Sequence, residues 1–192
     1  MRVSFLDVGQ ADATLVQAPG GWSLLVDAGG SFSARSDIGS RVVAPALWAL
    51  GVRRLDVAAL THGDPDHIGG MGTVLGDFAP REVEGRVAGA LDPVAFRIVK
   101  VPHHGSAGSS SPGLVEATAP CVAIVSAGHA NPFGHPAPEV VRRYRDAGAL
   151  VLETGREGAV TVETDGRQVR VRTETGRRFR YQAGRRQCEP LP

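Results

Sequence analysis

Four side chains that can bind a metal ion fall within six consecutive positions of this chain. They are His62, Asp64, Asp66 and His67, and they follow an apolar run over residues 57–60 that is typical of a buried strand. A strand that ends in a tight loop can direct such groups into one pocket. Carboxylates and imidazoles together form a mixed oxygen and nitrogen site, which suits manganese, zinc or iron better than calcium or a thiolate-bound structural zinc. The alternative is a solvated loop whose aspartates cap the next helix.

Two further groups of polar residues also follow predicted strands. His103 and His104 come directly after residues 96–101, and a serine-rich segment, residues 109–111, lies next to them in the sequence. A single histidine is usually structural, whereas an adjacent pair at the end of a strand favours a functional role. His135 follows a predicted strand and precedes a predicted helix, which favours a metal ligand over an ordinary loop histidine.

The hydrophobic pattern predicts the elements that must position these groups. Strands are expected over residues 2–7, 13–17, 22–26, 57–60, 96–101 and 122–126, and helices over residues 42–50, 71–78, 82–91, 114–117 and 138–147. A β-meander is expected over residues 151–154, 159–164, 168–173 and 179–181. Asp7 and Asp27 lie at predicted strand ends, and we interpret both as turn formers rather than ligands.

Length and charge place broad limits on the protein. A chain of 192 residues suits one domain with a sizeable core, and a net charge of +1 does not by itself indicate a nucleic-acid partner. No apolar run reaches the ~20 residues that a membrane-spanning helix needs, and no signal peptide precedes the first strand, so we expect a soluble chain. Cys121 and Cys188 form no metal-binding motif, and we interpret Cys121 as a buried thiol.

Arginines crowd the C-terminal region. They occupy positions Arg167, Arg170, Arg172, Arg177, Arg178, Arg180, Arg185 and Arg186. Alternate positions of a strand share a face, so Arg170 and Arg172 are expected to point the same way. An ordinary solvated edge sheet and a groove that follows phosphates are both consistent with this pattern.

The pattern His-x-Asp-x-Asp-His at residues 62–67 resembles the metal loop of the metallo-β-lactamase superfamily, in which His-x-His-x-Asp-His ends an inner strand. Asp64 stands where many members have the second histidine. Val-Pro-His-His-Gly-Ser at residues 101–106 and Asn-x-Phe-Gly-His-Pro at residues 131–136 resemble the C-terminal extracytoplasmic domain of the ComEC family of competence DNA-uptake channel proteins. The resemblance implies an α/β fold, an αββα sandwich, as a single domain over residues 1–192.

The resemblance also implies a ligand set for one or two divalent ions. One ion would be held by His62 and Asp64, and the second by Asp66, His67 and His135. Asp66 would also orient or deprotonate the attacking water. His103 or His104 would donate a proton to the leaving oxygen or complete the coordination, and the sequence leaves that choice open. Oxygen-rich ligation favours manganese, with zinc as the alternative.

The function implied by this resemblance is that of a metal-dependent hydrolase, a nuclease that cleaves phosphodiester bonds in DNA during natural transformation. Its partners would be DNA and the membrane-embedded channel portion of the same protein, and its location the extracytoplasmic face of the bacterial cytoplasmic membrane. Two other functions stay open. One is a hydrolase of a small ester, lactone or thioester on the same fold, and the other is a non-catalytic DNA-binding or gating module.

The chain departs from the family pattern between its two main histidine segments. The family has a long stretch there, including a strand that ends in Gly-Asp and supplies a carboxylate bridging both metals, whereas roughly thirty residues separate the segments in this chain. We interpret the difference as a segment omitted between Pro80 and Glu84, in a domain excised from a larger membrane channel protein. Asp77, which follows Gly76, is the alternative candidate for the bridging carboxylate.

Overall fold

The computed structural model describes residues 1–30, 37–61, 64–85, 98–182 and 191. The strands are β1 (Arg2–Phe5), β2 (Thr14–Gln17), β3 (Ser23–Val26), β4 (Val57–Leu60), β5 (Glu82–Gly85), β6 (Ile98–Lys100), β7 (Val122–Val125), β8 (Leu150–Glu153), β9 (Val160–Thr164), β10 (Gln168–Thr173) and β11 (Arg178–Gln182). The helices are η1 (Gly39–Val43), α1 (Ala44–Ala49), α2 (Pro65–Ile68), α3 (Met71–Phe78), η2 (Pro102–Gly105), α4 (Pro112–Thr118), α5 (Pro138–Asp146) and α6 (Thr154–Glu157).

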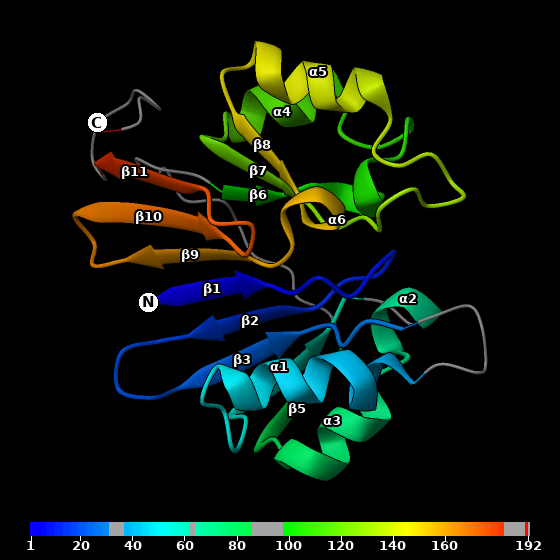
Figure 1. Cartoon of the computed structure of the whole chain (residues 1–192), viewed down its shortest axis with the longest axis vertical. Helices are drawn as coiled ribbons and strands as arrows, with labels where there is room; N and C mark the ends of the chain where they lie inside the picture. The colour runs from blue at the N-terminus through cyan, green and yellow to red at the C-terminus, as the bar shows by residue number, and fades with distance from the viewer. Residues whose placement is uncertain (31–36, 62–63, 86–97, 183–190, 192) are drawn as a thin grey trace.

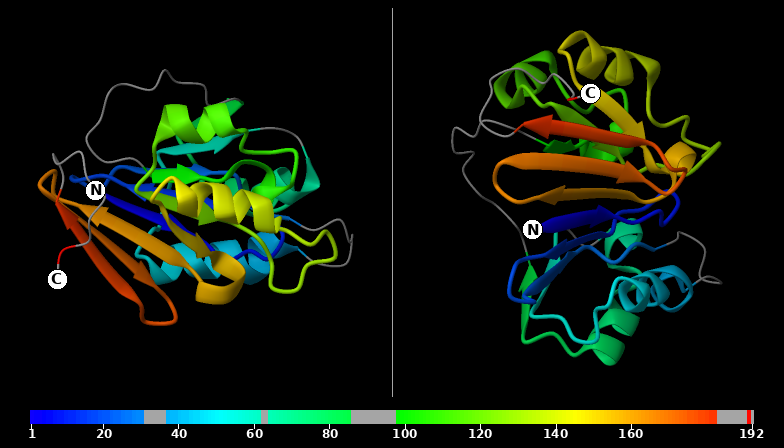
Figure 2. Two further views of the ribbon diagram at one scale, coloured as in Figure 1. Left: turned by 90° about the horizontal axis from the view of Figure 1, so that it is seen from above. Right: turned by 60° about the vertical axis from the view of Figure 1, so that its left-hand side comes forward.

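Two β-sheets pack face to face, with helices on both outer sides (Figure 1). The larger sheet has eight strands in the order β11-β10-β9-β1-β2-β3-β4-β5, and the smaller has three in the order β6-β7-β8. Figure 2 shows the two helix layers from further directions, with α4 and α5 over the smaller sheet and α1 and α3 over the larger one. The chain is therefore an αββα sandwich, as the sequence predicts.

The register of the larger sheet brings three strand ends to one edge. Phe5 at the end of β1 pairs with Thr14, Thr14 pairs with Val26 at the end of β3, and Val26 pairs with Ala59 near the end of β4. The loops that follow β1, β3 and β4 consequently leave the sheet side by side. Parallel strands that end at one edge commonly place functional loops there, because their carboxyl ends meet.

β7 is buried on both faces, which explains its continuous apolar sequence. Val122 and Ile124 pack between the two sheets. Ala123 and Val125 point the other way and pack with Tyr144 of α5. One strand thus joins two of the apolar layers of the sandwich.

The third apolar layer lies between the larger sheet and its helices. Leu15 and Leu25 of the sheet belong to the same buried cluster as Leu47 of α1 and Val74 and Phe78 of α3. None of the helices in the described ranges is long and apolar enough to cross a membrane.

Most predicted elements are confirmed, and the helix predicted over residues 82–91 is wrong in its described part. Residues 82–85 form β5, which pairs in parallel with β4, and residues 86–91 lie outside the described ranges. The edge of β4 offers unpaired backbone groups, and pairing with them outweighs the helical spacing of the apolar residues.

Two smaller interpretations are also corrected. The strand predicted over residues 151–154 belongs to the smaller sheet, where β8 pairs in parallel with β7, so the meander contains only β9, β10 and β11. Cys121 is disulfide-bonded and is not a buried thiol. Cys188 lies outside the described ranges.

Replacement of Ile124 by alanine is expected to lower the free energy of unfolding by about 2–5 kcal/mol, because it leaves a cavity between the two sheets. Denaturant unfolding followed by circular dichroism measures the change. Leu75→Ala is the matched control, since Leu75 on α3 is 41% exposed and its truncation leaves no cavity. Equal losses in the two variants would contradict this account of the core.

Candidate metal centre

Three buried side chains with metal-binding atoms meet where the strand ends gather. They are Asp12 from the loop after β1, His67 from α2 and His104 from η2, and one ligand atom from each lies within 4.8 Å of the others. Asp66 lies in the same place, with its Oδ2 2.8 Å from Nε2 of His104 and 3.6 Å from Nε2 of His67. We call these four residues the acceptor cluster.

His67 lies on the short helix α2, and a hydrogen bond to Asp27 orients its ring. Nδ1 of His67 lies 2.8 Å from Oδ2 of Asp27, and because an ionised carboxylate can only accept, Nδ1 carries the proton. Asp27 is itself fixed by the backbone N–H of Thr61 at 2.9 Å and by the Thr61 hydroxyl at 2.8 Å. Nε2 of His67 lies 3.6 Å from carboxylate oxygens of both Asp12 and Asp66.

Burial and the neighbouring polar groups have opposite effects on the pKa values of His67 and Asp27. Burial by itself lowers the pKa of His67, but the hydrogen bond to Asp27 and the negative charges of Asp12, Asp27 and Asp66 outweigh it and raise that pKa above its ordinary value. Burial raises the pKa of Asp27, and its hydrogen bonds from His67 and Thr61 reverse the effect and lower it. The site thus favours a positive charge at or near His67.

His104 is oriented from the opposite sheet. Its Nδ1 lies 2.7 Å from the carbonyl oxygen of Ser126, which can only accept, so Nδ1 donates and Nε2 of a neutral ring has a lone pair. That lone pair faces Oδ2 of Asp66 at 2.8 Å. Two acceptors at this distance repel unless a proton or a metal ion lies between them, so the geometry requires a cation here.

An unusual backbone places His104 in the centre and turns His103 outward. His103 and His104 have φ values of 51° and 53°, and Gly105 follows with φ 78°. The left-handed region is strained for residues other than glycine, and such strain concentrates at functional sites. Gly105 has no alternative, because a Cβ there would lie 2.6 Å from Cβ of Pro136.

Asp12 adds a second buried carboxylate beside Nε2 of His67. Its Oδ2 pairs with Nζ of Lys100, while its Oδ1 is buried with no hydrogen-bond partner among the described residues. An orphaned buried carboxylate oxygen is costly unless a donor or a cation reaches it. The acceptor cluster as a whole therefore fits a divalent ion bound by oxygen and nitrogen atoms.

The structure brings together only some of the residues that the sequence suggested. Asp66, His67 and His104 are in the acceptor cluster. Asp64 is exposed at the N-cap of α2, His103 is exposed, and His62 lies outside the described ranges.

His135 lies at the margin of the acceptor cluster rather than in it. Its ring stacks on Phe133 with centroids 5.9 Å apart. Burial lowers its pKa, and the charges of His104 and His103 lower it further, so the three imidazoles are near enough to interact. His135 also lines a pocket of about 490 Å³ together with Arg145 and Arg156.

Sequence reasoning missed Asp12, Lys100 and Ser126, and it gave Asp27 too small a role. Asp27 is not simply a turn former, because its buried carboxylate orients His67. Asp7 does form a turn, since its Oδ1 accepts from the N–H of Gly9 at 3.3 Å. Asp27 shares with the recognised residues its position directly after a strand, whereas Asp12 lies in the loop between β1 and β2.

Comparison with known proteins places the chain in a family. Residues 6–164 match the family model described as the metallo-β-lactamase superfamily. The chain belongs to the metallo-β-lactamase superfamily. The acceptor cluster lies within the matched region.

Two competence proteins are similar in sequence. ComE operon protein 3 of Bacillus subtilis is 23% identical over 251 residues, with 83% of this chain and 32% of that protein covered. Competence protein ComA of Neisseria gonorrhoeae is 28% identical over 223 residues, with 82% of this chain and 31% of that protein covered. The chain thus spans about a third of the length of these relatives.

Among solved structures, the chain is similar to a HARLDQ-motif mutant of a metallo-β-lactamase from Cronobacter sakazakii. The identity is 17%, the alignment covers 93% of this chain and 60% of that chain, and the TM-score is 0.35.

Asp27→Asn is expected to weaken binding of Mn²⁺ or Zn²⁺ by about 10–100-fold, because residues that orient a metal-binding histidine typically contribute that much to affinity. Isothermal titration of the metal-free protein measures the dissociation constant. Asp7→Asn, which alters a carboxylate outside the acceptor cluster, should leave the affinity unchanged. Wild-type affinity in Asp27→Asn would show that His67 does not depend on this hydrogen bond.

Proposed function

We propose that this chain is a metal-dependent nuclease domain that hydrolyses phosphodiester bonds in DNA during natural transformation. The single observation that carries the proposal is the acceptor cluster, in which buried carboxylates and imidazoles face one another and require a cation. Membership of a superfamily with a metal-binding fold and similarity to two competence proteins support the choice of reaction and of biological process.

Within this proposal the residues have distinct roles. His67 and His104 present their Nε2 atoms to a metal ion, and Asp66 contributes Oδ2 between them. This arrangement favours His104 over His135 as the third ligand of that ion and leaves His135 beside the substrate. His62 and Asp64 would supply the ligands of a second ion. A divalent ion would lower the pKa of a bound water and stabilise the negative charge that develops on the phosphate.

Asp66 and His103 would accept and donate the protons of the reaction. Asp66, fixed by His104, would accept the proton of the attacking water as a general base. His103 is exposed and adjacent to the acceptor cluster in sequence, so it would donate a proton to the leaving oxygen. Lys100 balances the charge of Asp12, which leaves the remaining negative charge of the cluster for the metal.

The carboxylates in the acceptor cluster favour manganese as the cofactor, with zinc as the alternative. DNA is the proposed substrate, and the membrane-embedded channel portion of a larger protein is the proposed partner. The domain would work at the extracytoplasmic face of the cytoplasmic membrane. The alignment with the Bacillus protein runs over more positions than the 192 residues of this chain, which supports our proposal that a segment present in relatives is omitted here. We propose residues 80–84 as the place of the omission from the spacing of the motifs.

Asp66→Asn is expected to reduce the rate of DNA cleavage by about 10²–10⁴-fold, since it removes a general base and a metal ligand. Labelled single- and double-stranded DNA is incubated with protein in Mn²⁺, Zn²⁺, Mg²⁺ or EDTA, and the products are separated on a gel. EDTA should abolish cleavage by the wild type.

Asp77→Asn is the matched control for this assay. Asp77 is exposed on α3, away from the acceptor cluster, so its variant should cleave like the wild type. Cleavage that survives in Asp66→Asn would come from another site or a contaminant. Absence of DNA cleavage by the metal-loaded wild type would overturn the nuclease proposal, and ester and lactone substrates would then be tested on the same preparations.

A further inference from the structure

The outer face of β9, β10 and β11 carries a concentration of arginines that the metal chemistry does not use. Along β10, exposed and buried residues alternate, so Arg170 and Arg172 point outward while the valines between them point into the core. Arg178 and Arg180 of the neighbouring strand are exposed in the same way. Arg2 of β1 extends the row on the other side. We call these residues the arginine face; they are Arg2, Arg170, Arg172, Arg178 and Arg180.

The strand register sets these positive charges directly opposite one another. Arg170 is the Cα partner of Arg180, and Arg172 is the partner of Arg178. Like charges at directly opposed positions of an antiparallel pair destabilise it, by up to about 1 kcal/mol for each pair. A solvated edge sheet would be more stable with mixed charges here, so this arrangement points to an anionic ligand that relieves the repulsion.

Few carboxylates on the arginine face neutralise it. Glu163 of β9 lies 2.6 Å from the guanidinium of Arg2 and 3.1 Å from that of Arg172. The hydrogen bond from Arg2, and then the charges of Arg172 and Arg170, hold the pKa of Glu163 below its ordinary value, so it is ionised and already engaged. Among the described residues, Arg170, Arg178 and Arg180 form no ion pair.

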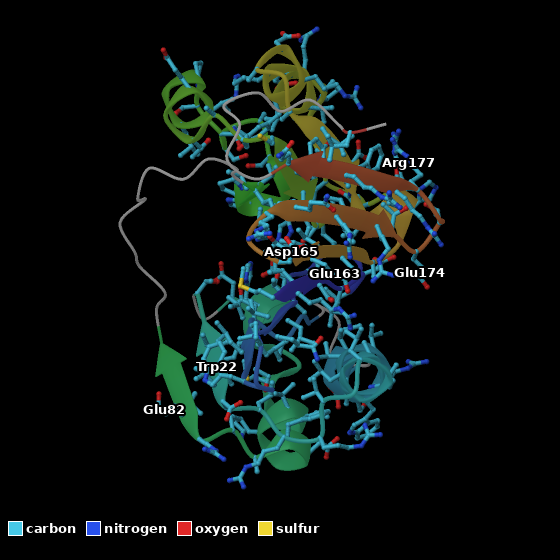
Figure 3. All side chains as sticks on the ribbon, turned by 90° about the vertical axis from the view of Figure 1, so that its left-hand side faces the viewer. Trp22, Glu82, Glu163, Asp165, Glu174 and Arg177 are labelled. Carbon is cyan, nitrogen blue, oxygen red and sulfur yellow. The ribbon has the colours of Figure 1, made fainter. Side chains whose placement is uncertain are left out.

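The acidic side chains at the ends of these strands, Asp165 and Glu174, accept hydrogen bonds from backbone N–H groups. Asp165 accepts from the backbone N–H groups of Arg167 and Gln168 at 2.8 and 2.7 Å. Glu174 accepts from the N–H of Ala159 at 3.1 Å. Figure 3 shows Glu163 on the sheet and Asp165 and Glu174 at opposite ends of the strands. Five arginines against the single carboxylate of Glu163 leave the centre of the arginine face with an excess of positive charge.

The arginine face is also hollowed along its length. One hollow of about 390 Å³ is lined by Arg2 and Arg170, a second of about 240 Å³ by Arg170, Arg172, Arg178 and Arg180, and a third of about 340 Å³ by Arg172 and Arg178. Neighbouring hollows share arginines, so they follow one another across the strands, and we call this row of hollows the track. A track of this kind suits an extended polymer better than a compact molecule.

The helix layer leaves this part of the sheet uncovered. Helices α1 and α3 pack over the half formed by β1 to β5, and the hydrogen bond of 3.1 Å from Gln17 Nε2 to the Leu50 carbonyl lies at the border. No helix of the described chain lies over the outer side of β9 to β11 (Figure 1).

We propose that the arginine face binds the sugar-phosphate backbone of a single DNA strand. Guanidinium groups pair with phosphate oxygens in a bidentate manner, and repeated phosphates match a row of arginines. An acidic membrane surface would call for apolar anchors beside the basic residues. The exposed Met1 beside Arg2 supplies one apolar side chain and not a row of anchors. The outward positions of β9 to β11 have none; they are Thr161, Glu163, Gln168, Arg170, Arg172, Arg178, Arg180 and Gln182.

The identity of the polymer rests on the proposed function, whereas the charge and the track are independent of it. All residues of the arginine face lie outside the acceptor cluster. Binding and cleavage can therefore be measured separately, and either proposal can fail without the other.

The test is fluorescence anisotropy of a labelled single-stranded oligonucleotide in EDTA, which removes metal-dependent cleavage. The variant is Arg170→Gln combined with Arg172→Gln, and the matched control is Arg54→Gln combined with Arg142→Gln, which removes the same charge from exposed sites elsewhere. The first variant should bind about tenfold more weakly and reduce the slope of log K against log salt by about 1.4, since each lost phosphate contact on a single strand contributes about 0.7. The control should behave like the wild type.

Three results would overturn the proposal. They are wild-type affinity and salt slope in the arginine-face variant, an equal loss in the control, or binding of the wild type to phosphatidylserine vesicles but not to DNA. Thermal unfolding of the variant excludes misfolding. Relief of the opposed like charges offsets the loss of the exposed Arg172–Glu163 ion pair, so the midpoint should stay close to that of the wild type.

A small phosphodiester, bis(p-nitrophenyl) phosphate with Mn²⁺, separates this proposal from the nuclease proposal. The arginine-face variant should hydrolyse it at the wild-type rate, because this substrate is too short to reach the track. Loss of that hydrolysis in the variant would mean that the arginines act at the metal centre, which contradicts a separate binding face. DNA binding that depends on the arginines in a protein that cleaves nothing would support the binding face and refute the nuclease proposal.

Discussion

The constraint on which the site depends is the approach of two acceptor atoms that need a proton or a metal ion between them. Nε2 of His104 and Oδ2 of Asp66 lie 2.8 Å apart, and the opposite nitrogen of His104 is already committed to the Ser126 carbonyl. Asp12 adds a buried oxygen without a partner in the described chain. Buried acceptors in such an arrangement are stable only with a proton or a metal ion between them, which makes the acceptor cluster a candidate site for a metal ion.

The scaffold supplies this arrangement from two sides. The larger sheet aligns the ends of β1, β3 and β4, and the loops that follow them carry Asp12, Asp27 and the α2 residues. The smaller sheet delivers His104 through η2, where the left-handed backbone turns the imidazole inward. Packing of the two sheets through Ile124 and its neighbours therefore sets the distance between the halves of the acceptor cluster.

The small net charge of the molecule conceals two separate regions, one negative and one positive. The total is +1, yet carboxylates gather at the metal centre and arginines gather on the outer face of β9 to β11. A negative centre attracts a divalent cation, and a positive face attracts a polyanion. The two regions belong to one domain and lie at different places on it.

The sequence alone determined most of the elements and the grouping of Asp66 with His67, because periodicity and short spacing are local properties, and its resemblance to a known family implied the αββα class. It also indicated His104 as one of a pair, and Arg170 with Arg172 as neighbours on one face. Only the tertiary structure shows that His104 points inward and His103 outward, and that residues 82–85 form a strand. It also shows that Asp27 orients His67 and that Lys100 pairs with Asp12. Those outcomes depend on contacts between residues far apart in the chain, which strand register and sheet packing create and which no local pattern contains.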